Sequence, residues 1–280
     1  LALNNQIDHN LLFNIANDCL RNHHNQTLLH QFLDLAHFSN VAKTISISGM
    51  EDEWFDLMMQ IISSSNYHFG YLLKQRSERY AEDIALTKIQ NDKQIKLNFK
   101  QLWFMTIEVE KALTTFDLNG EKKNIGILSR NILNSVLVDF ACLSFGRRVV
   151  PIPLNATSEH ISYILKHSEI DILFVDSKNG AYRLNEIEGT NALKIINLEN
   201  QNTSQSKIDS LPWDIFLQKG DFINHFDLKK LLASVELESV NTVMYTSGTT
   251  DNPKGITFTQ KNLMSKRFAR ALALPNIGSD

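Results

Sequence analysis

Residues 246–255 hold the side chains best suited to chemistry in this 280-residue chain. They read Thr-Ser-Gly-Thr-Thr-Asp-Asn-Pro-Lys-Gly, which offers four hydroxyls, two glycines and one lysine. Glycine lets a backbone approach a ligand closely, and N–H groups, hydroxyl donors and a cation together suit the oxygens of a polyphosphate. Strand-like residues precede the segment at 241–245, and an apolar run resumes at Ile256. The sequence therefore predicts a phosphate-binding loop between two strands.

This segment differs from the Walker phosphate-binding loop. A Walker loop reads G-x-x-x-x-G-K-[ST] and opens a helix. Here Pro253 stands where the second glycine is needed after Gly248, and a strand is expected to follow. The spacing and the context therefore exclude a Walker loop. An ordinary turn remains an alternative on composition alone, because Ser, Thr and Gly are common in turns.

A longer match decides against the ordinary turn. Residues 245–255 resemble the signature Y-T-S-G-T-T-G-x-P-K-G of the adenylate-forming superfamily, which includes acyl-CoA synthetases, luciferases and the adenylation domains of peptide synthetases. Asp251 departs from it, because the signature usually has glycine there. Aspartate adds a negative charge beside a phosphate site, although it tolerates positive φ better than most residues. Gln260 also departs, from the histidine of a T-H-x-N pattern, and neither change removes the resemblance.

The resemblance extends upstream and covers roughly residues 66–280. Residues 71–87 resemble the family's opening helix and first strand, and residues 97–113 resemble its T-Y-x-E-L strand-to-helix segment. A further match is to the Y-I-L-x-x-S pattern of long-chain acyl-CoA synthetases, formed by Tyr163, Ile164, Leu165 and Ser168. Within the superfamily, the chain is therefore most similar to long-chain fatty acid–CoA ligases.

The resemblance implies an AMP-forming ligase. Such enzymes join a carboxylate to ATP, release pyrophosphate, and transfer the acyl group of the acyl-adenylate to a thiol, usually that of coenzyme A. Donors fixed around the departing pyrophosphate stabilise its growing negative charge. By this resemblance the phosphate-binding residues are Thr246, Ser247, Gly248, Thr249, Thr250, Lys254 and Gly255. The implied cofactors are ATP, Mg²⁺ and coenzyme A.

The same resemblance assigns roles within the loop. Hydroxyls and backbone N–H groups would donate hydrogen bonds, Gly248 would permit close approach, and Lys254 would place positive charge near the β- and γ-phosphates. The family's adenine-binding motif, magnesium-binding glutamate, ribose-binding aspartate and catalytic lysine would all lie beyond Asp280. We therefore assign no catalytic residue and no metal ligand to the chain, and expect it to be inactive alone. Leu1 in place of methionine leads us to expect that the true start is missing.

Beyond Gly120 the apolar pattern predicts strands that alternate with helices. The predicted strands are 124–128, 149–152, 171–175 and 193–198, and the predicted helices are 132–145, 159–167 and 227–236. Such alternation is typical of βαβ units. The Asn-, Gln- and Ser-rich stretch 199–220 lacks periodicity and is expected to form a long surface connection. The expected fold class is α/β, with mainly parallel sheets flanked by helices.

Residues 1–65 form a predicted all-helical appendage of unknown role. Apolar residues recur at helical spacing up to a predicted helix at 54–62, and the polar residues 63–66 predict a turn. We expect a domain boundary there, with residues 66–280 as an incomplete AMP-binding domain. The appendage also contains three histidines spaced by seven residues, His23, His30 and His37. No carboxylate partner accompanies them, so a metal site is the weaker interpretation.

The composition excludes several classes of protein. A formal net charge of -3, with acids and bases interspersed, argues against a nucleic-acid partner. Cys19 and Cys142 show no CxxC spacing, which favours a reducing cytoplasm. The most apolar stretch, 132–145, is shorter than the roughly 20 residues that cross a bilayer, and it contains Asp139. We expect a cytoplasmic protein, with peripheral membrane contact through the appendage left open.

Three functions are compatible with these observations. The favoured one activates a long-chain fatty acid for transfer to coenzyme A. A close alternative loads the acyl group onto the phosphopantetheine thiol of a carrier protein. The third is a non-catalytic scaffold that keeps the nucleotide-binding fold and binds a partner through residues 1–65.

Overall fold

The structure is a computed structural model that describes residues 8–90, 93–118, 120–177, 183–190, 193–200, 209–246 and 252–275. The chain forms two compact units. Unit 1 contains Leu1–Gln75, Glu236–Glu238 and Thr259–Asp280, and unit 2 contains Arg76–Val235 and Ser239–Phe258. Residues within each unit contact one another more than they contact the other unit. The functional division expected between residues 65 and 66 stays a prediction.

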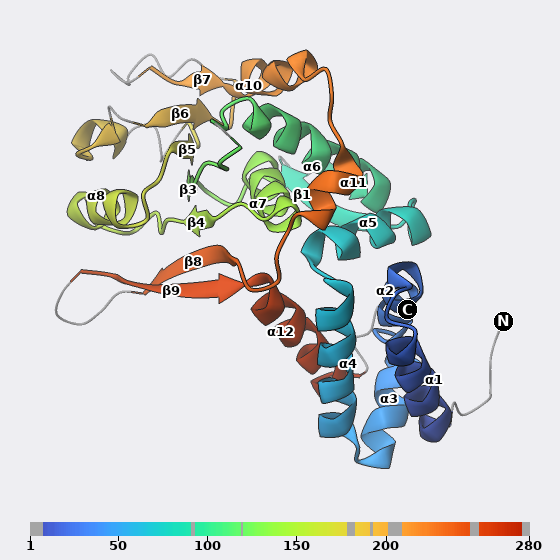
Figure 1. The fold of residues 1–280 in the computed structure, drawn as a ribbon. Coiled ribbons are helices and arrows are strands. Elements are labelled where there is room, and N and C mark those ends of the chain that lie inside the picture. Colours follow the sequence, from blue (N-terminus) through green and yellow to red (C-terminus); the bar gives the residue numbers. More distant parts are fainter. Residues whose placement is uncertain are drawn as a thin grey trace. The chain divides into compact units, whose positions relative to one another are not determined.

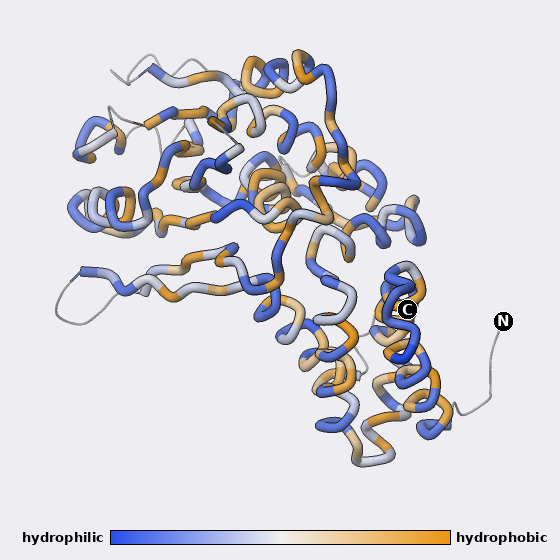
Figure 2. The backbone as a smooth tube through the Cα atoms, in the orientation of Figure 1, coloured by the Kyte–Doolittle hydropathy of each residue, from blue (hydrophilic) through white to orange (hydrophobic). Residues whose placement is uncertain are grey.

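Unit 1 is built mainly from helices. Its helices are α1 (His9–Arg21), α2 (Gln26–Leu35), α3 (Ser39–Ser48), α4 (Glu51–Ser65), α12 (Gln260–Ala273) and most of α5 (Phe69–Arg79) (Figure 1). Apolar and polar segments alternate along these helices (Figure 2), as expected where each helix buries one face. One core joins them, with buried residues that include Ala16, Leu33, Ile45, Ile61 and Phe268. Helix α12, distant in sequence, thereby packs against α3 and α4.

Helix α4 corrects the turn predicted at residues 63–66. The helix continues through Ser65 and ends at Asn66, which has a φ of 51°. The hydroxyl of Ser63 donates to the Met59 carbonyl at 2.8 Å, and that of Ser65 donates to the Ile61 carbonyl at 2.8 Å. Serine favours turns because its hydroxyl competes for backbone groups. Here both hydroxyls bond back to the preceding helical turn, so the serine run prolongs the helix.

Unit 2 is built around a seven-stranded sheet with the order β7-β6-β5-β3-β4-β8-β9. Its strands are β3 (Ile125–Leu128), β4 (Val149–Pro151), β5 (Ile172–Val175), β6 (Lys194–Asn197), β7 (Leu211–Pro212), β8 (Val240–Thr246) and β9 (Lys254–Thr259). The pairs β3–β4, β3–β5, β4–β8, β5–β6 and β6–β7 are all parallel. All residues of β3 and β5 are buried, as expected for strands covered on both faces. The predicted α/β class with a mainly parallel sheet is confirmed.

Helices and a hairpin surround this sheet within unit 2 (Figure 1). They are α6 (Phe99–Thr114), α7 (Leu133–Phe145), α8 (Ser158–His167), α10 (Trp213–Lys219), α11 (Leu228–Ala233), the short helices η1 (Leu184–Glu186) and η3 (Gly220–Phe222), and the antiparallel strands β1 (Ile84–Gln90) and β2 (Lys93–Asn98). Helix α7 ends at Gly146, whose φ of 67° suits glycine. The buried Asn241 amide then donates to the carbonyls of Cys142 and Arg147, which ties β8 to the turn after α7.

The long connection predicted at residues 199–220 is wrong in its second half. That half contains β7 and helix α10, which runs on into η3. Trp213 and Phe216 are buried, and the Phe216 ring packs edge-on against Phe174 with centroids 5.4 Å apart. With seven residues, this helix is shorter than the window over which helical periodicity can be recognised. The helix predicted at 227–236 is also shorter than expected, since α11 ends at Ala233.

Candidate functional site

The predicted phosphate-binding loop connects β8 to β9, so its predicted position between two strands is confirmed. Thr246 is the last residue of β8, and Lys254 is the first residue of β9. Both residues are exposed. The predicted contacts Ser247, Gly248, Thr249 and Thr250, together with Asp251, lie outside the described residues.

The residue before this loop is held by the end of helix α8. The phenolic oxygen of Tyr245 lies 2.6 Å from Nδ1 of His167 and 2.7 Å from Oγ of Ser168. Tyr245 is 9% exposed, so these polar partners satisfy a buried hydroxyl. Sequence patterns singled out Tyr245 and Ser168 separately, in two different motifs. Their contact, and the part played by His167, follow only from the fold.

Gly255 has a packing role at the start of β9. A Cβ atom at this position would lie 3.2 Å from Cζ of Tyr245 and 3.2 Å from Cγ1 of Val243. Such distances are tighter than nine in ten real Cβ contacts, so a side chain here would require Tyr245 and Val243 to shift by a few tenths of an ångström. This packing explains the glycine without a ligand. Its predicted contact with phosphate stays a prediction.

A cavity of about 390 Å³ lies beside the described ends of the loop. Tyr245, Thr246 and Pro253 form one wall, and the other lining residues are Pro153, Asn155, Ala156, Thr157, His160 and Ile164. Thr157 also caps α8, because its hydroxyl accepts a hydrogen bond from the His160 N–H at 3.2 Å. Of the predicted phosphate-binding residues that the structure describes, Thr246 lines this cavity whereas Lys254 and Gly255 do not.

The wall behind the cavity is firmly packed. Val243 and Tyr245 of β8 belong to a buried cluster with Ile161, Ile164 and Leu165 of α8. Helix α8 is therefore held at three places. Thr157 caps its start, the buried cluster packs against one face, and the Tyr245 hydroxyl contacts Ser168 at its end. The described edges of the loop are thus pre-positioned, which is the condition for electrostatic stabilisation without reorganisation.

His30 and His37 of the appendage, and also Cys142, are accounted for by packing and hydrogen bonds. His30 Nε2 donates to the Ser65 carbonyl at 3.0 Å, and His37 Nδ1 donates to the Leu33 carbonyl at 2.8 Å. No group of three His, Cys, Asp or Glu residues is arranged for a metal ion within the described ranges. Cys142 is fully buried, and burial raises the pKa of its thiol well above the usual value, which suits a core residue rather than a nucleophile.

The same described ranges hold no helix with the length and apolar character needed to cross a membrane.

Comparison with known proteins links the chain to one family. Residues 73–275 match the model of a family described as AMP-binding enzyme. The chain is 23% identical over 193 residues to the long-chain-fatty-acid–CoA ligase ACSBG2 of Xenopus laevis, covering 69% of this chain and 26% of the relative. It is 31% identical over 137 residues to the long-chain-fatty-acid–CoA ligase FadD15 of Mycobacterium bovis, covering 48% of this chain and 22% of that protein. The chain spans about a quarter of the length of these curated relatives.

A solved structure shares the fold of this chain. It is the o-succinylbenzoate CoA synthetase (MenE) of Bacillus subtilis in complex with the acyl-adenylate intermediate OSB-AMP. The two chains superpose with a TM-score of 0.51 at 20% identity, over 74% of this chain and 36% of the synthetase. At this identity the likeness concerns the fold.

Proposed function

Because the chain belongs to the AMP-binding enzyme family, we propose that the protein carrying it activates a carboxylic acid with ATP and transfers the acyl group to coenzyme A. In the first step a carboxylate oxygen attacks the α-phosphorus of ATP, the bond to the β-phosphate breaks, and pyrophosphate leaves. In the second step the thiol attacks the acyl carbon and AMP leaves. Residues 246–255 would act on the first step by stabilising the departing pyrophosphate.

One observation carries this proposal. The signature segment joins two neighbouring strands, and its described ends, Thr246 and Pro253, line the same cavity. Tyr245 is fixed directly before it by His167 and Ser168. Anchored ends support the proposal that N–H groups and hydroxyls of the signature are directed at phosphate oxygens.

Two described residues, Thr246 and Lys254, suit the phosphate end of a nucleotide. The Thr246 hydroxyl would donate to a phosphate oxygen from the cavity wall, and Lys254 would supply positive charge from β9. No carboxylate is among the described residues that line the cavity. Mg²⁺, which partly neutralises phosphate charge when bound, would therefore arrive with the nucleotide, and these residues would not ligate it.

A long-chain fatty acid is the proposed substrate. The curated relatives are named as long-chain-fatty-acid–CoA ligases, and Tyr163, Ile164, Leu165 and Ser168 match the Y-I-L-x-x-S pattern. Ser168 of that pattern contacts Tyr245 of the signature, so the two motifs meet at one site. A cytoplasmic location and coenzyme A as the thiol acceptor belong to the same proposal.

The test is ATP–pyrophosphate exchange by the protein that carries this chain. Replacing Thr249 by alanine removes one predicted donor and should lower the exchange rate about a hundredfold. Thr27→Ala, at an exposed position of α2, serves as the matched control and should leave the rate unchanged. An unchanged rate for Thr249→Ala would contradict the role of the loop.

Two further measurements separate the alternatives. Assaying fatty acids with coenzyme A and with a phosphopantetheinylated carrier protein identifies the thiol acceptor. A longer protein without exchange activity towards any carboxylate would favour the scaffold. Residues 1–280 should show no exchange by themselves, as the family resemblance implies, and measurable exchange would refute that expectation.

A further inference from the structure

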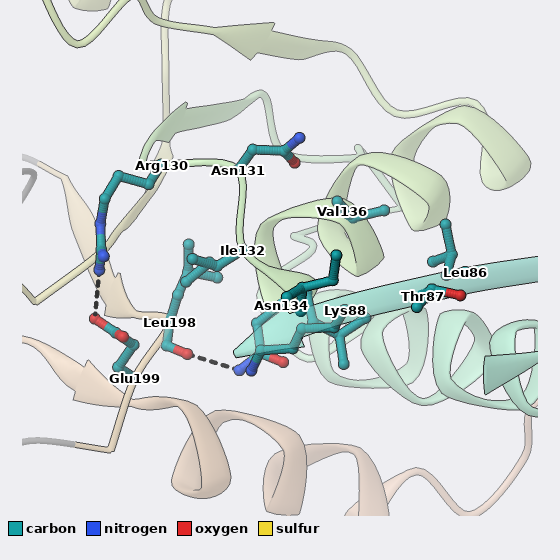
Figure 3. Close-up of a pocket in the computed structure, with 12 residues that line it drawn as sticks. Leu86, Thr87, Lys88, Arg130, Asn131, Ile132, Asn134, Val136, Leu198 and Glu199 are labelled. Atoms are coloured by element: carbon teal, nitrogen blue, oxygen red, sulfur yellow. Dashed lines mark hydrogen bonds and ion pairs between the residues drawn. The ribbon is translucent and has the colours of Figure 1, made fainter. Parts of the chain in front are cut away.

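A second pocket lies at the same edge of the sheet as the ends of β3 and β6. Its volume is about 460 Å³, within the usual range for small-molecule sites. It is lined by Leu86, Thr87, Lys88, Ile89, Arg130, Asn131, Ile132, Leu133, Asn134, Val136, Leu198 and Glu199 (Figure 3). None of these residues lines the cavity beside Tyr245.

The position of this pocket follows a general rule of parallel sheets. Strand β3 is followed in sequence by β4 on one side, and the chain then crosses to place β5 on the other side. Ligands of such sheets bind outside the carboxyl ends of the strands, where this reversal opens a crevice. Residues 130–134 directly follow β3, and Leu198 and Glu199 directly follow β6, so the pocket occupies this edge.

The walls of the pocket are fixed by hydrogen bonds. The Arg130 N–H and Nε both donate to Oδ2 of the fully buried Asp176, at 2.7 and 3.0 Å. Nη2 of Arg130 also reaches Oε2 of Glu199 at 3.3 Å, and the Asn134 amide donates to the Leu198 carbonyl at 2.7 Å (Figure 3). These bonds join the ends of β3, β5 and β6, so this side of the pocket is preformed, and β1 supplies the opposite side.

Among the charged residues that the structure describes in this pocket, one cation has no ion-pair partner. Arg130 is already neutralised by Asp176 and Glu199. Lys88 is partly buried on β1 and makes no ion pair with any residue that the structure describes. A singly charged anion therefore suits this pocket, whereas a doubly charged phosphate would also face the Glu199 carboxylate. Around Lys88 the lining is largely apolar, with Leu86, Ile132, Leu133, Val136 and Leu198.

We propose that this pocket binds a small amphiphilic carboxylate, with its apolar part against Leu86, Ile132, Val136 and Leu198 and its carboxylate at Lys88. Apolar contact would supply most of the affinity and the ammonium group would orient the ligand. Binding needs no nucleotide, so this proposal is independent of the one for residues 246–255.

The experiment uses octanoate as the probe and octanamide as its uncharged analogue, with calorimetric titration of the 280-residue chain. Lys88→Gln should weaken octanoate binding at least about tenfold and leave octanamide binding unchanged. Lys96→Gln is the matched control, because Lys96 is an exposed lysine of the same hairpin and is not among the residues that line the pocket. It should leave both affinities unchanged.

Methyl NMR of the same chain locates the ligand. The proposal expects octanoate to shift the methyl signals of Leu86, Val136 and Leu198, and these shifts should diminish in Lys88→Gln. Absence of binding at millimolar octanoate would overturn it. So would equal octanoate affinity for Lys88→Gln and the unsubstituted chain, or shifts confined to Ile164 in the cavity beside Tyr245.

Discussion

The phenolic oxygen of Tyr245 lies 2.7 Å from Oγ of Ser168, although the two residues are 77 positions apart in sequence. His167 Nδ1 approaches the same oxygen at 2.6 Å. The end of β8 is therefore attached to the end of α8 directly before Thr246. Because Tyr245 also packs over Gly255, one side chain fixes both strands that carry the predicted phosphate-binding loop.

We predict that Tyr245→Phe destabilises the chain by about 1–2 kcal/mol, because the Ser168 hydroxyl and the His167 ring lose a buried partner while the aromatic packing is kept. Urea unfolding measures the change. Tyr163→Phe is the control, since Tyr163 stacks on His167 without a hydroxyl bond among the contacts described. In the protein proposed to activate a carboxylate, Tyr245→Phe should also raise the KM for ATP. Equal stability losses for the two variants would contradict the anchoring role.

Gly255→Ala should destabilise the chain by about 1–3 kcal/mol, because the new methyl group would overpack against Tyr245 and Val243. The destabilisation would come from contact with two side chains, so shortening one of these side chains should reduce it. In a Tyr245→Ala background the same substitution should cost clearly less, and a double-mutant cycle in urea measures the difference. Additive effects would show that the Tyr245 ring does not set the cost.

Much of this fold was predictable where apolar spacing is strong and local. The alternation of strands and helices between residues 124 and 198 predicted four of the parallel strands, and the strands on both sides of residues 246–255 were predicted from their flanking runs. Helix α10 was missed because it has only seven residues and directly follows a polar stretch rich in Asn, Gln and Ser. The serine-rich end of α4 was missed because serine favours turns, whereas here the hydroxyls of Ser63 and Ser65 bond back to the preceding helical turn.

Contacts between distant segments could not be predicted from one sequence. His167 has no spacing that marks it as a partner of Tyr245, since the fold alone brings α8 to β8. Likewise, helix α12 is amphipathic, but periodicity does not state which core it joins, and it packs in unit 1 with α3 and α4. The pocket around Lys88 draws on β1, the loop after β3 and the end of β6, so no local motif announces it.

Arg147→Met should destabilise the chain by about 3–5 kcal/mol. The Arg147 guanidinium is fully buried and lies 2.7 Å from Glu110 and 2.7 Å from Asp117. Burial alone would lower its pKa, but the two carboxylates raise it, so the charge is held in the folded state. Removing it leaves carboxylates with little solvent to compensate them. Arg148→Met, at the adjacent partly exposed position, should cost far less in the same urea titration, and similar losses would count against a buried ion network.

Asp139→Asn should stabilise the chain near neutral pH. Burial in α7 raises the pKa of Asp139 to about 6, above the usual 3.8. The folded state therefore favours the protonated carboxyl group of Asp139. The stability that this group contributes is fully present below its pKa in the unfolded chain, and it is lost as the pH rises through about 6. Asparagine cannot ionise, so the variant should gain on the order of 2 kcal/mol above that pH and almost nothing near the usual pKa. Urea midpoints across this range measure the gain, with Asp221→Asn as the exposed control. A gain that does not depend on pH would mean that ionisation of Asp139 is not its cause.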